Sequence, residues 1–137
     1  MDLRLPIPDA LSETYWSAAA EGRLLIQRCT QCAHLQFYPR GHCVRCLHPA
    51  PVWIDASRTG TLHSFTIVRR TPNADWSDEV PYVFALVDLD EGVRITTNVR
   101  SADLESLRCG QGVEIHFEER DGVHVPVAHE TSLERTN

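Results

Sequence analysis

Four of the five cysteines in this 137-residue chain lie within the stretch RCTQCAHLQFYPRGHCVRC, and this crowding constrains the fold more than any other feature. Cys29, Cys32, Cys43 and Cys46 form the pattern C-x2-C-x10-C-x2-C, two tight pairs joined by a loop. Each pair predicts a knuckle turn that points two sulfurs at a common centre. Two knuckles together supply four thiolates about 2.3 Å from a Zn²⁺ ion and leave no open coordination position. We therefore expect one structural zinc per chain.

Other uses of these cysteines stay open at this point. Disulfide bonds are disfavoured because five cysteines leave one thiol unpaired. A rubredoxin-like iron centre would use similar knuckles, whereas a thioredoxin-like redox C-x-x-C needs a βαβ pattern that this sequence lacks. The fifth cysteine, Cys109, lies in a predicted turn, LRCGQG, with no base nearby that could activate it, so we interpret it as structural.

Charge and hydropathy disfavour several classes of protein. The formal net charge is −6, and the thirteen basic residues are all arginines that are scattered along the chain, which argues against general polyanion binding. No apolar run approaches a membrane span. The first residues, MDLRLPIPDALSETYW, carry acids and prolines where a secretory signal has a basic start and an apolar stretch. We expect a cytoplasmic protein.

The segment before the cysteines is predicted to be helical. In PDALSETYWSAAAEG an acid can cap the first turn, alanines fill the middle and a glycine can end the helix. Leu11, Tyr15 and either Ala18 or Ala19 fall on one face, and Trp16 widens it. This face packs either on the chain's own domain or on another protein, which makes Tyr15 and Trp16 candidate partner contacts.

After the cysteines the hydrophobic pattern alternates with the period of β-strands. We expect strands in TGTLHSFTIVRR, PYVFALVDLD, VRITTNVR, VEIHFEE and VHVPVA, and a short helix in SADLESLRCGQG between the third and the fourth strand. Asp121-Gly122 predicts a hairpin, and Pro126 marks the last strand as an edge strand or a bulge. This order is that of an OB-fold, a five-stranded Greek-key barrel.

These patterns divide the chain into three segments of a mainly β protein. We expect an N-terminal helical segment at 1–26, a rubredoxin-like zinc ribbon at 27–52 and an OB-fold domain at 53–137. The sequence contains no G-x-S-x-G, no H-E-x-x-H and no phosphate-binding glycine loop. His116 and His124 can face each other across the last hairpin, but we interpret them as surface residues. An enzyme that acts alone is disfavoured.

The succession of these segments resembles a known family, the zinc-ribbon plus OB-fold proteins formerly called domain-of-unknown-function family thirty-five and described as acyl-CoA-associated. The resemblance covers almost the whole chain. It rests on YW in the helix and on GRLLIQRCTQCAHLQFYPRGHCVRC, GTLHSFTIVRR, PYVFALVDLDEGVRITTNV and GQGVEIHFEERDGVHVPVA. Departures from the pattern are Ala33 and Leu47, where glycines often follow the cysteine pairs, and Val44, where proline is frequent.

The resemblance implies a non-catalytic accessory subunit. Its partner would be a thiolase-fold enzyme, such as a thiolase or a thiolase-like aldolase of steroid side-chain breakdown, or a MaoC-like hydratase. The helix and ribbon would dock this enzyme, and the OB part would help to hold an acyl-CoA. The two together would form a hetero-oligomer.

Candidate residues for the acyl-CoA follow from this implication. Arg69 and Arg70 precede the loop TPNADWSDEV; guanidinium groups suit phosphates, and Trp76 can stack on adenine. The alternative is that these arginines pair with Asp75 or Asp78 at the surface. A second functional class, a module for single-stranded nucleic acid, is common among OB-folds, but the net acidity and the few aromatic residues disfavour it here.

Overall fold

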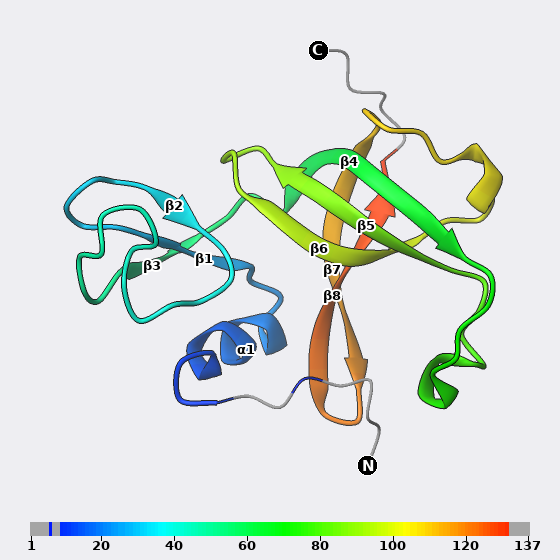
Figure 1. Ribbon diagram of the computed structural model, residues 1–137, viewed down its shortest axis with the longest axis horizontal. Coiled ribbons are helices and arrows are strands. Elements are labelled where there is room, and N and C mark those ends of the chain that lie inside the picture. Colours follow the sequence, from blue (N-terminus) through cyan, green and yellow to red (C-terminus); the bar gives the residue numbers. More distant parts are fainter. Residues whose placement is uncertain (1–5, 7–8, 132–137) are drawn as a thin grey trace.

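The chain folds into a three-stranded sheet and a closed five-stranded barrel, with one α-helix between them (Figure 1). This computed structural model describes residue 6 and residues 9–131. The ends of the expected first and third segments, at 1–5, 7–8 and 132–137, lie outside the described residues. The expected architecture, mainly β with an N-terminal helix, a zinc ribbon and an OB-fold barrel, is confirmed.

The helix α1 spans Glu13–Ala20 and begins after Ser12. The Asp9 carboxylate accepts hydrogen bonds from the backbone N–H and the hydroxyl of Ser12, both at 2.8 Å, and so closes the turn that leads into the helix. Tyr15 and Ala18 lie on the buried face, as expected. Leu11 does not share that face, because it precedes the helix and its side chain is 44% exposed.

Strands β1 (Leu25–Arg28), β2 (Leu35–Gln36) and β3 (Val52–Asp55) form the small sheet, in the order β2-β1-β3. Both β2 and β3 run antiparallel to β1. The two cysteine pairs lie in the turns around this sheet. Because β3 reaches Asp55, the sheet includes residues that the sequence assigned to the OB-fold segment.

The barrel consists of β4 (Thr59–Val68), β5 (Tyr82–Leu89), β6 (Arg94–Arg100), β7 (Gly112–Arg120) and β8 (Val123–Glu130). Its order is β4-β5-β6-β8-β7, and β7 closes on β4. The short 3₁₀-helices η1 (Ala74–Trp76) and η2 (Leu104–Ser106) follow β4 and β6. The helix that the sequence predicts between the third and fourth barrel strands is η2.

The β7–β8 hairpin confirms one prediction and corrects another. Asp121 and Gly122 form its turn with φ angles of 49° and 82°, which are typical of a tight two-residue turn. Strand β8 is not an edge strand, since it pairs with β7 on one side and in parallel with β6 on the other. The pairing with β6 begins at Val127, so Pro126 lies just before it and needs no N–H there.

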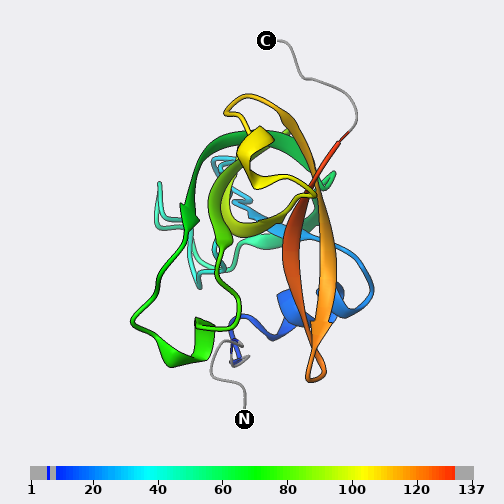
Figure 2. The ribbon, with the colours of Figure 1, turned by 90° about the vertical axis from the view of Figure 1, so that its right-hand side faces the viewer.

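One hydrophobic core joins all three parts. Tyr15 of α1 and Ile26 of β1 belong to the same buried cluster as Leu62 and Ile115 of the barrel. The helix packs on the β7–β8 hairpin and on β1, and both ribbon views show it at the lower end of the barrel (Figures 1 and 2). The ribbon, the helix and the barrel are therefore held in one geometry. None of the helices in the described part of the chain could span a bilayer.

Candidate metal centre and aromatic pocket

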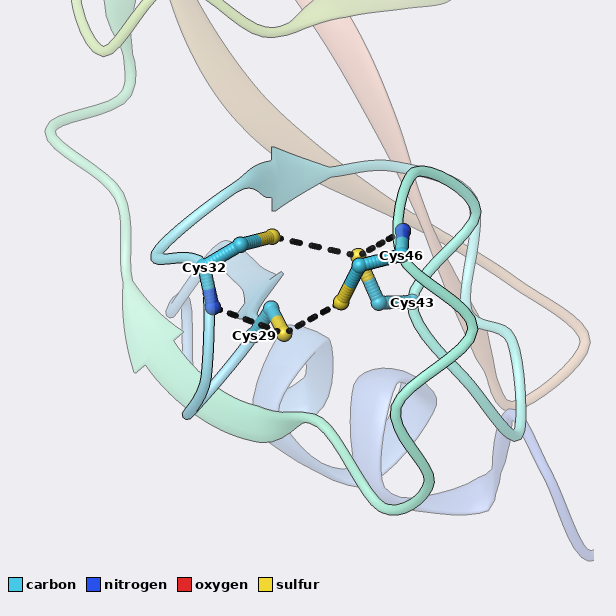
Figure 3. Close-up of side chains that lie close together, drawn as sticks. All are labelled: Cys29, Cys32, Cys43 and Cys46. Carbon is cyan, nitrogen blue, oxygen red and sulfur yellow. Dashed lines mark hydrogen bonds between the residues drawn. The ribbon is translucent and has the colours of Figure 1, made fainter.

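The four cysteines of the two knuckles converge on one point. Their sulfur atoms lie within 4.8 Å of one another, and Figure 3 shows the four side chains pointing toward a common centre. The Sγ atoms of Cys29 and Cys46 are 3.5 Å apart, and those of Cys32 and Cys43 are 3.7 Å apart. A tetrahedron with arms of about 2.3 Å has edges of about 3.8 Å, so this sulfur cage fits a tetrahedral zinc ion.

Both knuckles use the same backbone hydrogen bonds. In the first, the N–H groups of Gln31 and Cys32 donate to Cys29 Sγ at 3.3 and 3.4 Å. In the second, the N–H groups of Arg45 and Cys46 donate to Cys43 Sγ at 3.4 and 3.5 Å. These contacts, with that from Cys32 the largest, lower the pKa of the Cys29 thiol to about 6. The matching contacts lower the pKa of Cys43. Each knuckle thus stabilises the thiolate of its first cysteine. The pKa of Cys46 is instead raised to about 12, because burial and the neighbouring thiols outweigh its backbone hydrogen bond with His48.

Each knuckle ends on a residue with left-handed backbone. Ala33 donates its N–H to Cys29 O at 3.1 Å with φ of 63°, and Leu47 donates to Cys43 O at 2.9 Å with φ of 67°. Glycine adopts this conformation at the lowest cost, which explains why glycines are frequent at these two positions of such knuckles. The two departures from the pattern therefore leave the turn geometry intact.

A buried pair of glutamines supports the second knuckle, and the sequence analysis did not identify it. Gln36 Nε2 donates to Gln27 Oε1 at 2.9 Å and to His42 O at 3.1 Å, while Gln36 Oε1 accepts the N–H of Val44 at 3.0 Å. Gln27 Nε2 in turn donates a hydrogen bond to Arg40 O, and Gln27 Oε1 accepts one from the N–H of Arg40. These amides tie the loop between the cysteine pairs to β1 and β2. In the sequence, both glutamines stand in apolar stretches next to the first cysteine pair, LLIQRC and LQF. Polar side chains placed in this way need hydrogen-bond partners when the stretch is buried, and this signal could have revealed the network.

A second candidate site is a cavity of about 370 Å³ where α1 and the ribbon meet the barrel. It brings together three residues that the sequence proposed for different tasks: Tyr15, Trp16 and Trp76 all line it. Tyr15 is 1% exposed and belongs to the core, so its ring lines this pocket from within the core. Burial raises the pKa of its phenol. Trp16 is partly buried against the same core.

The arginines proposed beside Trp76 do not line this pocket. Arg69 and Arg70 are exposed at the end of β4, and Arg69 forms an ion pair with Glu105. That acid was not among the partners expected from the loop. The arginine at the pocket is Arg120, whose guanidinium bonds Glu118 at 3.2 Å.

Glu118 also accepts two hydrogen bonds of 2.9 Å from Arg100. Arg100 is the last residue of β6, the strand that supplies Asn98 to the pocket. These bonds with Arg100, followed by those with Arg120, lower the pKa of Glu118 to about 2. The carboxylate therefore stays ionised over the ordinary pH range and pairs with both guanidinium groups, so the three side chains together keep one positive charge.

The histidines of the last hairpin pair differently from the prediction. His116 lies opposite Val127 in the register of β7 and β8, and His124 lies opposite Glu119. The ring next to His116 is that of His129, with centroids 4.8 Å apart. His116 and His124 do not face each other, because the register of β7 and β8 places His124 three residues from Val127, the cross-strand partner of His116.

Comparison with known proteins agrees with this arrangement. Residues 16–51 match the rubredoxin-like zinc ribbon domain of ChsH2, and residues 53–118 match the C-terminal OB-fold domain of ChsH2. A DUF35 domain-containing scaffold protein of Methanothermobacter thermautotrophicus is 33% identical over 102 residues, which cover 70% of this chain and 76% of that protein. A probable enoyl-CoA hydratase alpha subunit of Thermomonospora curvata is 33% identical over 107 residues. That match covers 78% of this chain but only about a third of that subunit.

Solved structures show the same fold. The structure described as the Ltp2-ChsH2(DUF35) aldolase superposes with a TM-score of 0.81 and 28% identity, over 92% of this chain and 98% of that one. A DUF35-family protein from Sulfolobus solfataricus superposes with a TM-score of 0.63 at 11% identity, over 89% and 86% of the two chains, which supports the fold alone. The ribbon with its four cysteines positioned for one structural zinc is confirmed. The chain belongs to the DUF35 family of zinc-ribbon and OB-fold proteins that includes ChsH2.

Proposed function

We propose that this chain is a non-catalytic accessory subunit that binds a thiolase-fold enzyme or a MaoC-like hydratase and helps it to hold an acyl-CoA substrate. The single observation that carries the proposal is the match, over nearly the full length of both chains, to a structure described as the Ltp2-ChsH2(DUF35) aldolase. The names of two relatives, a scaffold protein and a probable hydratase alpha subunit, point the same way.

The proposed role of the metal is structural. Cys29, Cys32, Cys43 and Cys46 would be its four ligands, so no coordination position remains for a substrate. The zinc holds the two knuckles together, and the shared core fixes the ribbon and α1 against the barrel. The surface proposed below for the enzyme, on the ribbon, and the surface proposed for the substrate, on the barrel, then keep a constant spacing. A scaffold between an enzyme and its substrate requires such a constant spacing.

The surface proposed for the partner enzyme is the second knuckle. Val44 and Leu47 expose 53% and 69% of their side chains there, although both are apolar. An exposed apolar pair on a metal-rigidified turn loses little entropy when another protein covers it. Tyr15 is buried in the core and is not part of this surface.

Capture of the partner tests this surface. The tagged native chain and its Val44→Asp variant are used to isolate bound proteins from the host lysate, and the zinc content of both is measured. We expect a thiolase-fold or hydratase-fold enzyme with the native chain and at least tenfold less of it with Val44→Asp at unchanged zinc content. Val52→Asp, the same change at an exposed valine of β3, is the matched control. Equal recovery with both variants would reject the second knuckle as the docking surface.

Arg69 and Arg70 remain the proposed contacts for the phosphates of the acyl-CoA. Arg69 is held by Glu105, and both side chains are exposed at the barrel end that precedes η1. Replacement of both by alanine should raise the Kd of the assembled complex for a CoA thioester about tenfold. Arg23→Ala, which removes a guanidinium paired with Asp55 on the ribbon side, is the control. An unchanged Kd would discard the site.

The alternative, a module for single-stranded nucleic acid, has less support. The two arginines of β6 that could meet phosphates are already bound to acids: Arg94 to Asp88 at 2.7 Å and Arg100 to Glu118 at 2.9 Å. The net charge of −6 also disfavours the binding of a polyanion such as single-stranded nucleic acid.

A further inference from the structure

The aromatic pocket continues into a second pocket, and the two form one groove. The first, of about 370 Å³, lies where α1 and the ribbon meet the barrel, and the second, of about 170 Å³, adjoins it at the end of β6. Residues that line both pockets are Trp76, Tyr82, Asn98 and Arg120. The groove is longer than either pocket alone, so it suits an extended occupant better than a compact one.

Most of the aromatic rings of the chain lie along this groove. Seven of the ten phenylalanine, tyrosine and tryptophan residues line its first pocket. Two of these rings are open to solvent, since Tyr38 and Phe84 are 39% and 48% exposed. At the junction of the two pockets, Trp76 of η1 packs on Tyr82 with ring centroids 4.9 Å apart. Exposed aromatic rings gathered in one place mark a binding surface.

Prolines lie among these rings. Pro6, which belongs to no helix or strand, is half-buried and lines the first pocket. Pro126 of β8 lines the same pocket, and Pro81 lines the second pocket beside Tyr82. The groove thus already holds an irregular proline against aromatic side chains. Grooves lined by aromatic rings commonly recognise proline-rich segments in the polyproline II conformation.

Hydrogen-bond donors stand where the two pockets join. A polyproline II segment forms no internal hydrogen bonds, so its carbonyl groups are free to accept from a binding surface. Asn98 and Arg120 are both partly exposed. Asn98 Nδ2 donates one of its two N–H groups to Val83 O at 2.9 Å. Arg120 has five N–H groups and bonds Glu118 at 3.2 Å. Both side chains can therefore also donate to the carbonyl groups of an extended segment.

Charge does not select the occupant of the groove. Glu118 bonds both Arg100 and Arg120, and Glu79 lines the second pocket with the same two arginines. Two acids thus stand beside two arginines. A segment without charged side chains can lie along this edge.

From these observations we propose that the groove is a docking site for an extended, proline-rich segment of a partner protein, bound in the polyproline II conformation. Its prolyl rings pack on the exposed aromatic rings, and its carbonyl groups accept hydrogen bonds from Asn98 and Arg120. The segment binds to this chain whichever enzyme the second knuckle contacts. Failure of this proposal and failure of the accessory-subunit proposal are therefore distinguishable.

The test uses the full zinc-loaded chain and fluorescein-labelled decaproline, a peptide that forms the polyproline II helix. We expect saturable binding at one site per chain in fluorescence anisotropy, with a Kd below about 1 mM. Decaproline made of D-proline has the same composition but the opposite helical hand, and it should bind at least about tenfold more weakly. Absence of saturable binding, or equal affinity for the two peptides, would overturn the proposal. Competition by N-acetylprolinamide at the same concentration would also overturn it, because the site would then hold a compact molecule.

Variants locate the peptide in the groove. Phe84→Ala and Tyr38→Ala each remove an exposed ring and should weaken binding about fivefold at unchanged zinc content. Val52→Ala, at an apolar residue of similar exposure outside the groove, should leave the Kd unchanged. Equal weakening by Val52→Ala would place the peptide elsewhere and reject the groove.

Pro6→Ala distinguishes a partner segment from the proline of this chain. We expect this variant to bind decaproline as the native chain does, because the groove has room beside Pro6. If only Pro6→Ala binds the peptide, the N-terminal residues of the chain itself are the occupant, and the proposal of a partner segment is wrong.

Discussion

Replacement of Gln36 should destabilise the ribbon far more than its distance from the sulfur atoms suggests. Its side chain is 5% exposed and holds Gln27, His42 O and the N–H of Val44. In Gln36→Ala, the His42 carbonyl and the Val44 N–H lose these partners in a buried environment. Each such group costs about 1–3 kcal/mol, so we expect a loss of about 3–4 kcal/mol in the free energy of unfolding. This is a large part of the usual 5–15 kcal/mol of a domain.

The assay is urea unfolding of the zinc-loaded protein, followed by tryptophan fluorescence and by circular dichroism. Because Val44 follows Cys43 directly, we also expect zinc affinity to fall about tenfold in a competition with a chromophoric chelator. Gln36→Met keeps most of the volume and should be nearly as unstable, which separates the lost hydrogen bonds from a cavity. Gln31→Ala, an exposed glutamine in the first knuckle, is the control and should change stability by less than about 0.5 kcal/mol. A loss below about 1 kcal/mol in Gln36→Ala would show that the hydrogen bonds of Gln36 contribute little to the stability of the ribbon.

Cys32→Ser should lose the zinc and unfold the ribbon locally, and one zinc per chain in that variant by elemental analysis would reject the metal site. Ala33→Gly, which relaxes a φ of 63°, should raise the urea midpoint by an amount equivalent to about 0.5–1 kcal/mol, whereas a lower midpoint would show that the turn is not strained. Hydrogen bonds from Arg100 lower the pKa of Glu118 to about 2. The ionised carboxylate therefore adds about 1 kcal/mol to the free energy of unfolding, after allowance for solvent screening. This stabilisation is present above pH 4.5 and is lost as the pH falls toward 2. Glu118→Gln should therefore be less stable than the native chain at pH 7 but not at pH 2.5 in acid titrations of unfolding, and an equal gap at both pH values would contradict the ion pair.

The ribbon could be predicted from the sequence because its information is local. The spacing of Cys29, Cys32, Cys43 and Cys46 sets each knuckle, and the sulfur cage needs only two such turns to meet. The order of the barrel strands was also readable, since each strand alternates with period two and the Asp121-Gly122 turn fixes its own hairpin.

The pocket could not be predicted because it depends on contacts between distant segments. Tyr15, Phe37 and Trp76 come from three elements, and nothing in their local patterns indicates that they meet. For the same reason, the sequence could not show which arginine lies at the pocket. Arg69 is adjacent to the loop of Trp76 in sequence, but the barrel register brings Arg120 to the pocket instead.

We propose that the chain assists an enzyme and performs no chemistry of its own. The most direct measurement compares acyl-CoA turnover by three purified samples: the captured partner enzyme alone, the chain alone, and the two recombined. We expect no turnover by the chain alone, and a kcat/KM for the recombined complex at least tenfold above that of the enzyme alone. Turnover by the chain alone, or equal kcat/KM for the enzyme with and without it, would reject the role of a non-catalytic accessory subunit.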